Sequence, residues 1–157
     1  MTDMLVKLYE LPELAPVLVK QQAEGIDVRR ALAAEKHLIT NWVRVNFSAT
    51  WGSECEVALS HHPVSCFVAV HEGQLVGFAC HEATCRGFFG PIGVAESARV
   101  KGTGKALLLA CLHDMWTQGY GYAIIGGVGP IEFYEKVVGA TVIENSTPGV
   151  YRGVLRG

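Results

Sequence analysis

The segment from Gly93 to Ala106 contains residue types that could hold a phosphate group. Gly102 and Gly104 stand where an apolar run ending near Val94 gives way to a helical pattern that starts near Thr103. Glycine lets backbone N–H groups approach a ligand closely, and the first N–H groups of a helix have no partner within the helix. The helix dipole favours negative charge at the same place. Together with three nearby cations, Arg99, Lys101 and Lys105, the segment predicts a pyrophosphate site.

Two other phosphate-binding motifs do not fit this segment. The Walker loop requires Ser or Thr after its Gly-Lys pair, but Gly104-Lys105 is followed by Ala106, so the hydroxyl that binds magnesium is missing. The dinucleotide fingerprint requires a third glycine at position 107, which is Leu107. The segment therefore fits neither the Walker loop nor the dinucleotide fingerprint.

The same residues resemble a known family. Arg99-x-x-Gly102-x-Gly104 matches the [QR]-x-x-G-x-[GA] signature of the GNAT acetyltransferase superfamily, and the preceding strand and following apolar helix supply the context of that motif. Phe133 to Ala140 resembles the family's F-Y-E-K-x-G-F segment. The resemblance covers about Val64 to Ile143, and it implies a fold in which one mainly antiparallel sheet splays apart between two strands.

The resemblance implies acetyl-CoA as co-substrate, with no metal. Its pyrophosphate would lie on the loop from Arg99 to Lys105, and its pantetheine arm would pair with the strand residues Ile92 to Val94. The Gly-Pro-Ile-Gly run at 90–93 is a physical cause for the splay beside that strand. The cofactor-binding residues expected on this basis are Ile92, Gly93, Val94, Arg99, Val100, Lys101, Gly102, Thr103, Gly104, Lys105 and Ala106.

The mechanism that the resemblance implies is direct acyl transfer to an amine. A backbone N–H near Val94 would hold the developing oxyanion, and Tyr134 matches the tyrosine that protonates the leaving thiolate. The sequence departs from the family pattern because the run from Phe88 to Val94 carries no acidic residue, which leaves the base unassigned. The run from Gly127 to Pro130 also lacks the asparagine that many members place there.

Three residues are candidates for contact with the acceptor. Trp42 and Trp51 belong to a region where the family places substrate-determining segments, although core packing is the default for each tryptophan. Glu82 follows His81 at the end of a strand that could face the acceptor. Surface exposure is the commoner fate of such a glutamate.

Composition limits the classes of protein. The 157 residues, half of them hydrophobic, fit one domain spanning 1–157 with a full core. A net charge of −2 gives no broad attraction to nucleic acid or anionic lipid, and no apolar stretch is long enough to span a membrane. Five irregularly spaced cysteines without a C-x-x-C pair argue against a disulfide framework and a zinc ribbon, and favour the reducing cytoplasm.

Hydrophobic patterning predicts the elements that would position these residues. Leu14 to Ala23, Asp27 to Val43, a segment from Ser53 to His61, Thr103 to Trp116 and Pro130 to Val138 are expected as helices. The expected strands are Leu5 to Tyr9, Val64 to Val70, Gln74 to His81, Phe88 to Val94, Tyr120 to Ile125, Ala140 to Ile143 and Val150 to Leu155. The fold class expected is mixed α/β, with helices on both faces of the sheet.

The sequence thus predicts an N-acetyltransferase that moves an acetyl or short acyl group from CoA to a small-molecule or peptide amine. A CoA-binding regulatory module without catalysis, or an interaction domain whose glycine loop binds nothing, are the alternatives. Homodimers are common in the family, and the sequence itself leaves the oligomeric state open.

Overall fold

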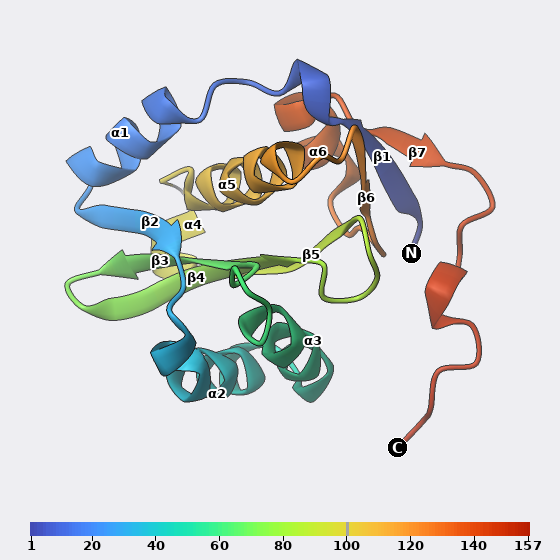
Figure 1. The fold of residues 1–157 in the computed structure, drawn as a ribbon, viewed down its shortest axis with the longest axis horizontal. Helices are drawn as coiled ribbons and strands as arrows, with labels where there is room; N and C mark the ends of the chain where they lie inside the picture. Colours follow the sequence, from blue (N-terminus) through green and yellow to red (C-terminus); the bar gives the residue numbers. More distant parts are fainter. Residues whose placement is uncertain (100) are drawn as a thin grey trace.

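The computed structural model describes residues 1–99 and 101–157, and the strands of these residues form one seven-stranded sheet (Figure 1). The strands run in the order β2-β3-β4-β5-β6-β1-β7, and all neighbours are antiparallel except β5 and β6. Their bounds are β1 Asp3–Lys7, β2 Ile26–Arg30, β3 Cys66–His71, β4 Gln74–His81, β5 Phe88–Val94, β6 Tyr122–Ile125 and β7 Thr141–Ile143. The predicted mixed α/β class with a mainly antiparallel sheet is confirmed.

Helices cover both faces of the sheet (Figure 1). The α-helices are α1 Ala15–Ala23, α2 Lys36–Asn46, α3 Ala49–Leu59, α4 Glu96–Arg99, α5 Thr103–Thr117 and α6 Ile131–Val138. Residues of α1, α5 and α6 pack into one hydrophobic cluster with the sheet, and residues of α2 and α3 pack into a second cluster on the opposite face. No helix of the described residues is both long and apolar enough to cross a bilayer.

Helix α5 is the central helix of the larger cluster. It is buried on most sides, and Leu107, Leu108, Leu109 and Leu112 have no exposed surface. A helix that is apolar all round belongs inside a core. The N-terminus of α5 is therefore held in a fixed place relative to β4 and β5, which it covers.

The prediction of one helix from Asp27 to Val43 is wrong. The structure has the strand β2 over Ile26–Arg30, which pairs with β3, and the helix α2 begins only at Lys36. The spacing of apolar residues in this segment fits a helix, but Ile26, Val28 and Arg30 also alternate as a strand requires. Pairing with the edge of the sheet favours the strand over the helix.

The start of one helix and the last predicted strand also differ from the predictions. Helix α3 begins before Ser53, because Ser48 caps it: its hydroxyl accepts a hydrogen bond from the Trp51 backbone N–H at 3.1 Å. The predicted strand from Val150 to Leu155 is wrong, since only a short 3-10 turn, Gly149–Tyr151, forms there. Leu155 is 95% exposed, and the segment has no neighbouring strand among the described residues.

Strands β5 and β6 pair over a short distance and then separate. Their parallel ladder consists of Phe88 with Ile124 and Phe89 with Ile125. Beyond it, Gly90 has a φ of +123°, which favours glycine, and Pro91 has no N–H to donate to a ladder. The Gly-Pro run thus coincides with the point where the two strands part, as the sequence predicts.

Candidate active site

A cleft of about 820 Å³ lies where β5 and β6 separate. Its lining is mostly apolar and comes from β5, the segment after β6, α3, α6 and the C-terminal segment. The lining residues are Met1, Thr50, Trp51, Glu54, Thr84, Phe89 to Val94, Arg99, Gly104, Ile125 to Pro130, Phe133, Tyr134, Thr147, Pro148 and Tyr151.

The backbone of β5 presents polar groups to this cleft. The Ala95 N–H donates to the Val76 carbonyl of β4 at 2.8 Å, so Ala95 faces β4. Successive residues of a strand point their backbone groups to opposite sides. The N–H groups of Ile92 and Val94 therefore point away from β4, toward the side that β6 has left. On that side the Arg99 Nε donates to the Val94 carbonyl at 3.1 Å.

Gly93 is required at its position by close packing. A Cβ added there would overlap the ring of Phe47, which lies against the β5 backbone from the α2–α3 side of the sheet. The Phe47 ring in turn packs against Trp51, with their centroids 5.2 Å apart. Aromatic packing on one face thus fixes the strand whose backbone lines the cleft.

The turn before α5 is shaped by Gly102, whose φ of +76° belongs to the left-handed region. The N-cap residue Gly102 has no side chain to cap the helix that follows, so within the described part of the chain the first N–H groups of the helix are left to solvent or a ligand. Gln21 of α1, which is 2% exposed, spans the turn. Its side-chain amide donates to the Lys101 carbonyl at 2.6 Å and accepts from the Thr103 hydroxyl at 2.7 Å. No local sequence pattern indicates this contact from a helix about 80 residues away.

The predicted cofactor residues fall into three groups. Ile92, Gly93, Val94, Arg99 and Gly104 line the cleft. The others at the loop do not line it: Lys101, Gly102 and Lys105 are exposed, and Thr103 and Ala106 are buried beneath the turn. Val100 lies outside the described residues.

Tyr134 lies on α6 and lines the cleft. Its side chain is largely buried beside Phe133, with the two ring centroids 5.0 Å apart. Burial raises the pKa of Tyr134 to about 12, so the hydroxyl keeps its proton at neutral pH. Among the described residues the hydroxyl has no hydrogen-bond partner, although it is not sealed off from the cleft.

The N-terminal strand holds the segment between β6 and α6 in place. The Asp3 carboxylate accepts a hydrogen bond from the Gly127 N–H at 2.8 Å, and the Val128 N–H donates to the Thr2 carbonyl at 2.8 Å. This segment carries no asparagine, and its cleft wall is made of backbone, Val128 and Pro130.

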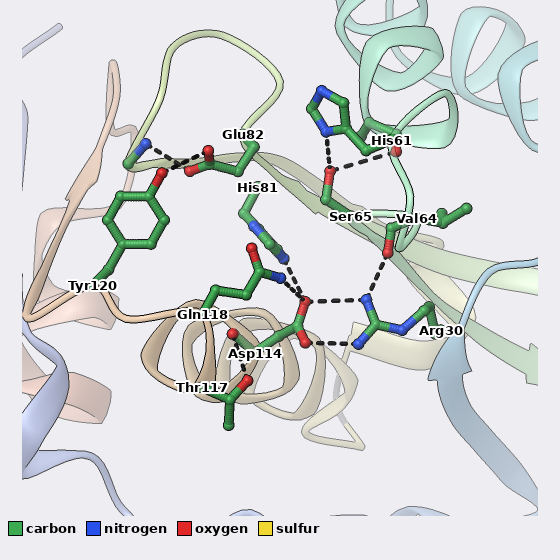
Figure 2. Close-up of polar contacts among 12 residues, drawn as sticks. Arg30, His61, Val64, Ser65, His81, Glu82, Asp114, Thr117, Gln118 and Tyr120 are labelled. Atoms are coloured by element: carbon green, nitrogen blue, oxygen red, sulfur yellow. Dashed lines mark hydrogen bonds and ion pairs between the residues drawn. The ribbon is translucent and has the colours of Figure 1, made fainter.

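The three predicted acceptor residues lie in different places. Trp51 of α3 lines the cleft. Trp42 does not: it packs edge-on against Phe78 and lines a separate groove beside α2. Glu82 does not line the cleft either, because it fastens the loop between β4 and β5. Its carboxylate accepts from the Gly87 N–H at 2.6 Å and from the Tyr120 hydroxyl at 2.8 Å (Figure 2).

The sequence patterns do not predict a cluster of polar residues that the structure places in the cleft. The carboxylate of Glu54 on α3 accepts hydrogen bonds from the hydroxyls of Thr84 and Tyr151. Burial raises the pKa of Tyr151, and the neighbouring Glu54 charge acts in the same direction, so Tyr151 is the donor. These residues come from three segments far apart in the chain, and no local pattern joins them.

A largely buried ionic network connects α5 with the sheet (Figure 2). Asp114 accepts two hydrogen bonds from Arg30, at 2.6 and 3.0 Å, and one from Nε2 of His81 at 2.8 Å. Burial alone raises the pKa of Asp114, but the bonds from His81 and Arg30 outweigh it and lower the pKa to about 2. His81 is fully buried in this contact, so it faces the core and not an acceptor.

One group of described residues could offer several ligands to a metal ion. The sulfurs of Cys55, Cys66 and Cys80 lie within 4.8 Å of one another on the α3 side of the sheet. All three are buried in an apolar cluster with no basic side chain. The hydrogen bond with Cys55 and burial raise the pKa of Cys66, and burial raises the pKa of Cys80, whereas hydrogen bonds from these two thiols lower the pKa of Cys55 to about 5. Cys66 and Cys80 are therefore protonated and pack as small apolar groups, and Cys55 is the one thiol of the three whose thiolate form is favoured.

Comparison with known proteins supports the fold and the family. A model described as the acetyltransferase (GNAT) family matches residues 36–140. A GCN5-related glucosamine N-acetyltransferase region of a fungal multi-domain GH3 β-N-acetylglucosaminidase is similar with a TM-score of 0.72 at 16% identity, over 90% of this chain and 19% of that chain. The GCN5-related N-acetyltransferase from Sphaerobacter thermophilus gives 0.66 at 20% identity, over 90% of this chain and 48% of its own.

A third protein, the GCN5-related N-acetyltransferase from Kribbella flavida, gives a TM-score of 0.59 at 15% identity, over 90% of this chain and 53% of its own. The chain thus spans between about one fifth and one half of the length of these solved chains, and at such identities the similarity shows the fold alone. No curated protein matches the sequence. Because the family model covers more than half of the residues, the chain belongs to the GNAT acetyltransferase family.

Proposed function

We propose that this protein transfers an acetyl group, or another short acyl group, from CoA to a primary amine by direct attack. The observation that carries the proposal is the cleft at the β5–β6 separation. It brings together the open backbone of β5, the start of α5 and the protonated hydroxyl of Tyr134.

The residues present fit an extended coenzyme with a diphosphate. The start of α5 has no side-chain cap, Gly104 lines the cleft, and Arg99 supplies a cation beside it. Backbone N–H groups and an arginine are the donors that bind phosphate oxygens in proteins. In this proposal the exposed side chains of Lys101 and Lys105 attract the negatively charged diphosphate from a distance. The buried residues Thr103 and Ala106 hold the first turn of α5 in place by packing.

The backbone of β5 would hold the pantetheine arm. The N–H groups of Ile92 and Val94 face the opening, and an extended chain with amide groups can pair with that of Ile92 as an additional strand does, which leaves the Val94 N–H for the thioester. When bound, acetyl-CoA supplies the thioester whose carbonyl carbon the amine attacks.

The residues of the cleft would then do three things. The β5 backbone orients the thioester, and the Val94 N–H donates to its carbonyl oxygen as negative charge develops there. Tyr134 gives its proton to the leaving sulfur. The bond between nitrogen and carbon forms, the carbon–sulfur bond breaks, and the proton that the nitrogen loses replaces the one that Tyr134 gives up.

A thiol-release assay tests the proposal. Purified protein with acetyl-CoA and a panel of primary amines is expected to liberate free CoA thiol and an equal amount of N-acetyl product, measured by mass spectrometry. Binding of acetyl-CoA without amide formation for any amine would instead indicate a CoA-binding module without catalysis.

A further inference from the structure

One wall of the cleft is built by α3, the loop after β4 and the C-terminal segment. Its side chains include Trp51, Glu54, Thr84, Pro148 and Tyr151. None of these belongs to the segments that the coenzyme proposal uses. The wall is therefore free to face the second substrate.

Glu54 is the one carboxylate among the described residues that line this cleft. The two hydroxyls that it binds both donate to Oε2, so Oε1 has no hydrogen-bond partner among the residues described. No salt bridge within residues 1–99 and 101–157 involves Glu54. A fixed carboxylate with an open oxygen and no counterion attracts a cationic hydrogen-bond donor.

Among the described residues, this wall has no basic side chain that could neutralise an anion. Arg99 is the one basic side chain among the described lining residues, and its Nε is bonded to the Val94 carbonyl at the end of β5. Around Glu54 the remaining surface is apolar or hydroxylic, with the ring of Trp51 and the ring of Pro148. A substrate that carries a carboxylate next to its amine would bring that carboxylate toward Glu54 without a positive partner.

We propose that this wall is the acceptor site, and that it selects a primary amine carried as a cation on an apolar body without a neighbouring carboxylate. Glu54 binds the ammonium group, Thr84 and Tyr151 hold Glu54 in place, and Trp51 packs against the body. The inference rests on the proposed function and names the substrate class of the same site.

The protons balance in this arrangement. The bound ammonium loses one proton to solvent by way of Glu54 and becomes a neutral amine that can attack. After attack the nitrogen loses a second proton as the carbon–sulfur bond breaks, and the sulfur gains one from Tyr134. Ammonium and thioester thus give amide, thiol and one released proton.

A matched pair of acceptors tests the selection. 2-Phenylethylamine and L-phenylalanine differ by the carboxylate, and we expect kcat/KM for the amine to exceed that for the amino acid by roughly 10- to 100-fold, the range of a charged hydrogen bond. In Glu54→Gln, KM for 2-phenylethylamine should rise by a similar factor and the preference between the two acceptors should shrink. The Kd for acetyl-CoA, measured by calorimetry, should stay within about 2-fold, which also shows that the variant folds.

Glu56→Gln is the control variant. Glu56 lies on the same helix but pairs with Arg44 at the surface, where its side chain is 45% exposed, and it does not line the cleft. Glu56→Gln should leave kcat/KM for both acceptors unchanged. Equal use of the two acceptors by the wild type, or a Glu54→Gln variant with unchanged KM and preference, would overturn the acceptor site. A wild type that binds acetyl-CoA but acetylates neither compound would also overturn it, whereas failure of the coenzyme assignment would show as no acetyl-CoA binding at all.

Discussion

Tyr134 combines accessibility to the cleft with a strongly held proton. Burial raises its pKa to about 12, so the group that the proposed reaction would use as a donor is protonated throughout the physiological range. The ring of its neighbour Phe133 packs edge-on against it.

Tyr134→Phe removes this donor and leaves the ring in place. We expect kcat to fall on the order of 10²- to 10⁴-fold, the range of general acid catalysis, while the Kd for acetyl-CoA changes little. Activity that depends on the protonated hydroxyl is full below the ordinary tyrosine pKa and is lost only as pH rises through about 12. Wild-type kcat should therefore show no descending limb from this group between about pH 8 and 10. Tyr120→Phe, outside the cleft, is the control, and an unchanged kcat in Tyr134→Phe would remove Tyr134 from the mechanism.

The ionic contacts of Asp114 lead to a prediction about the free energy of unfolding. Asp114→Asn breaks the pair with Arg30 and should cost about 2–3 kcal/mol at pH 7, below the roughly 3–5 kcal/mol of a fully buried pair because the Arg30 side chain is 35% exposed. The folded pKa of about 2 lies below the unfolded value of about 3.9, so this stability is present above about pH 4 and is lost as pH falls toward 2. Urea unfolding of wild type and variant should converge over that interval.

Asp27→Asn provides the comparison for Asp114→Asn. The Asp27 side chain is 62% exposed and lies 3.9 Å from Arg29, so its loss should stay within about 0.5 kcal/mol at every pH. A difference between wild type and Asp114→Asn that does not change between pH 7 and 2 would contradict the role given to the carboxylate.

Single residues differed in how well the sequence predicted them. Arg99, Gly104 and Tyr134 belong to short local patterns, and each lies in the cleft. Glu54 has no such pattern, since its partners Thr84 and Tyr151 come from distant segments. The position of Glu82 at the end of a strand predicts contact with the acceptor. A carboxylate at that position can equally accept a hydrogen bond from the following turn, as Glu82 does from the Gly87 N–H.

At the scale of elements, β5 depends on a glycine that an aromatic ring covers. Gly93→Ala should destabilise the fold by about 1–3 kcal/mol, because the added methyl group overlaps Phe47. The displaced strand should also bind acetyl-CoA more weakly. Gly121→Ala is the matched control, since a Cβ there meets no atom within 4 Å. Thermal unfolding and calorimetry measure both effects, and equal stability of the two variants would show that β5 tolerates the methyl group.

The hydrogen bonds of Gln21 join α1 to the turn before α5, and they lead to a second prediction about how elements are positioned. Gln21→Ala leaves the buried Thr103 hydroxyl without its partner and frees the Lys101 carbonyl. We expect a loss of about 1–3 kcal/mol in stability and a Kd for acetyl-CoA that is about 10-fold higher. Gln22→Ala, an exposed neighbour, should do neither. Unaltered acetyl-CoA binding in Gln21→Ala would mean that α1 does not position the turn.

The elements were predicted best where local pattern and burial agree. The central helix α5 follows from a long apolar run that ends before Gly119, and the strands β4 and β5 follow from short apolar runs separated by turn residues, although β4 contains Gly77 and β5 contains Gly90 and Pro91. Strand β2 was missed because its sequence fits a helix as well, and pairing with β3, distant in sequence, decided the outcome. The helix start at Ser48 was missed because Ser53 offers an equally good capping pattern.

For the whole molecule, the family motif anticipated the order of layers that a pattern of short strands alone does not determine. Two hydrophobic clusters, one on each face, hold the sheet between α5 and the pair α2 and α3. The cleft forms at the line where β5 and β6 part, and α3, α6 and the C-terminal segment close around it. The sequence alone could not place the C-terminal segment there, because its contacts are long-range side-chain bonds such as Tyr151 to Glu54.

In the proposed function, the start of α5 and the edge of β5 bind acetyl-CoA through its diphosphate and its pantetheine arm. Calorimetric titration with acetyl-CoA and with acetyl-pantetheine, which lacks the diphosphate, tests this most directly. We expect stoichiometric binding of acetyl-CoA and a Kd for acetyl-pantetheine that is roughly 10- to 100-fold higher, because the shorter compound lacks the charged hydrogen bonds of the diphosphate. No binding of acetyl-CoA, or equal affinity for both compounds, would contradict it.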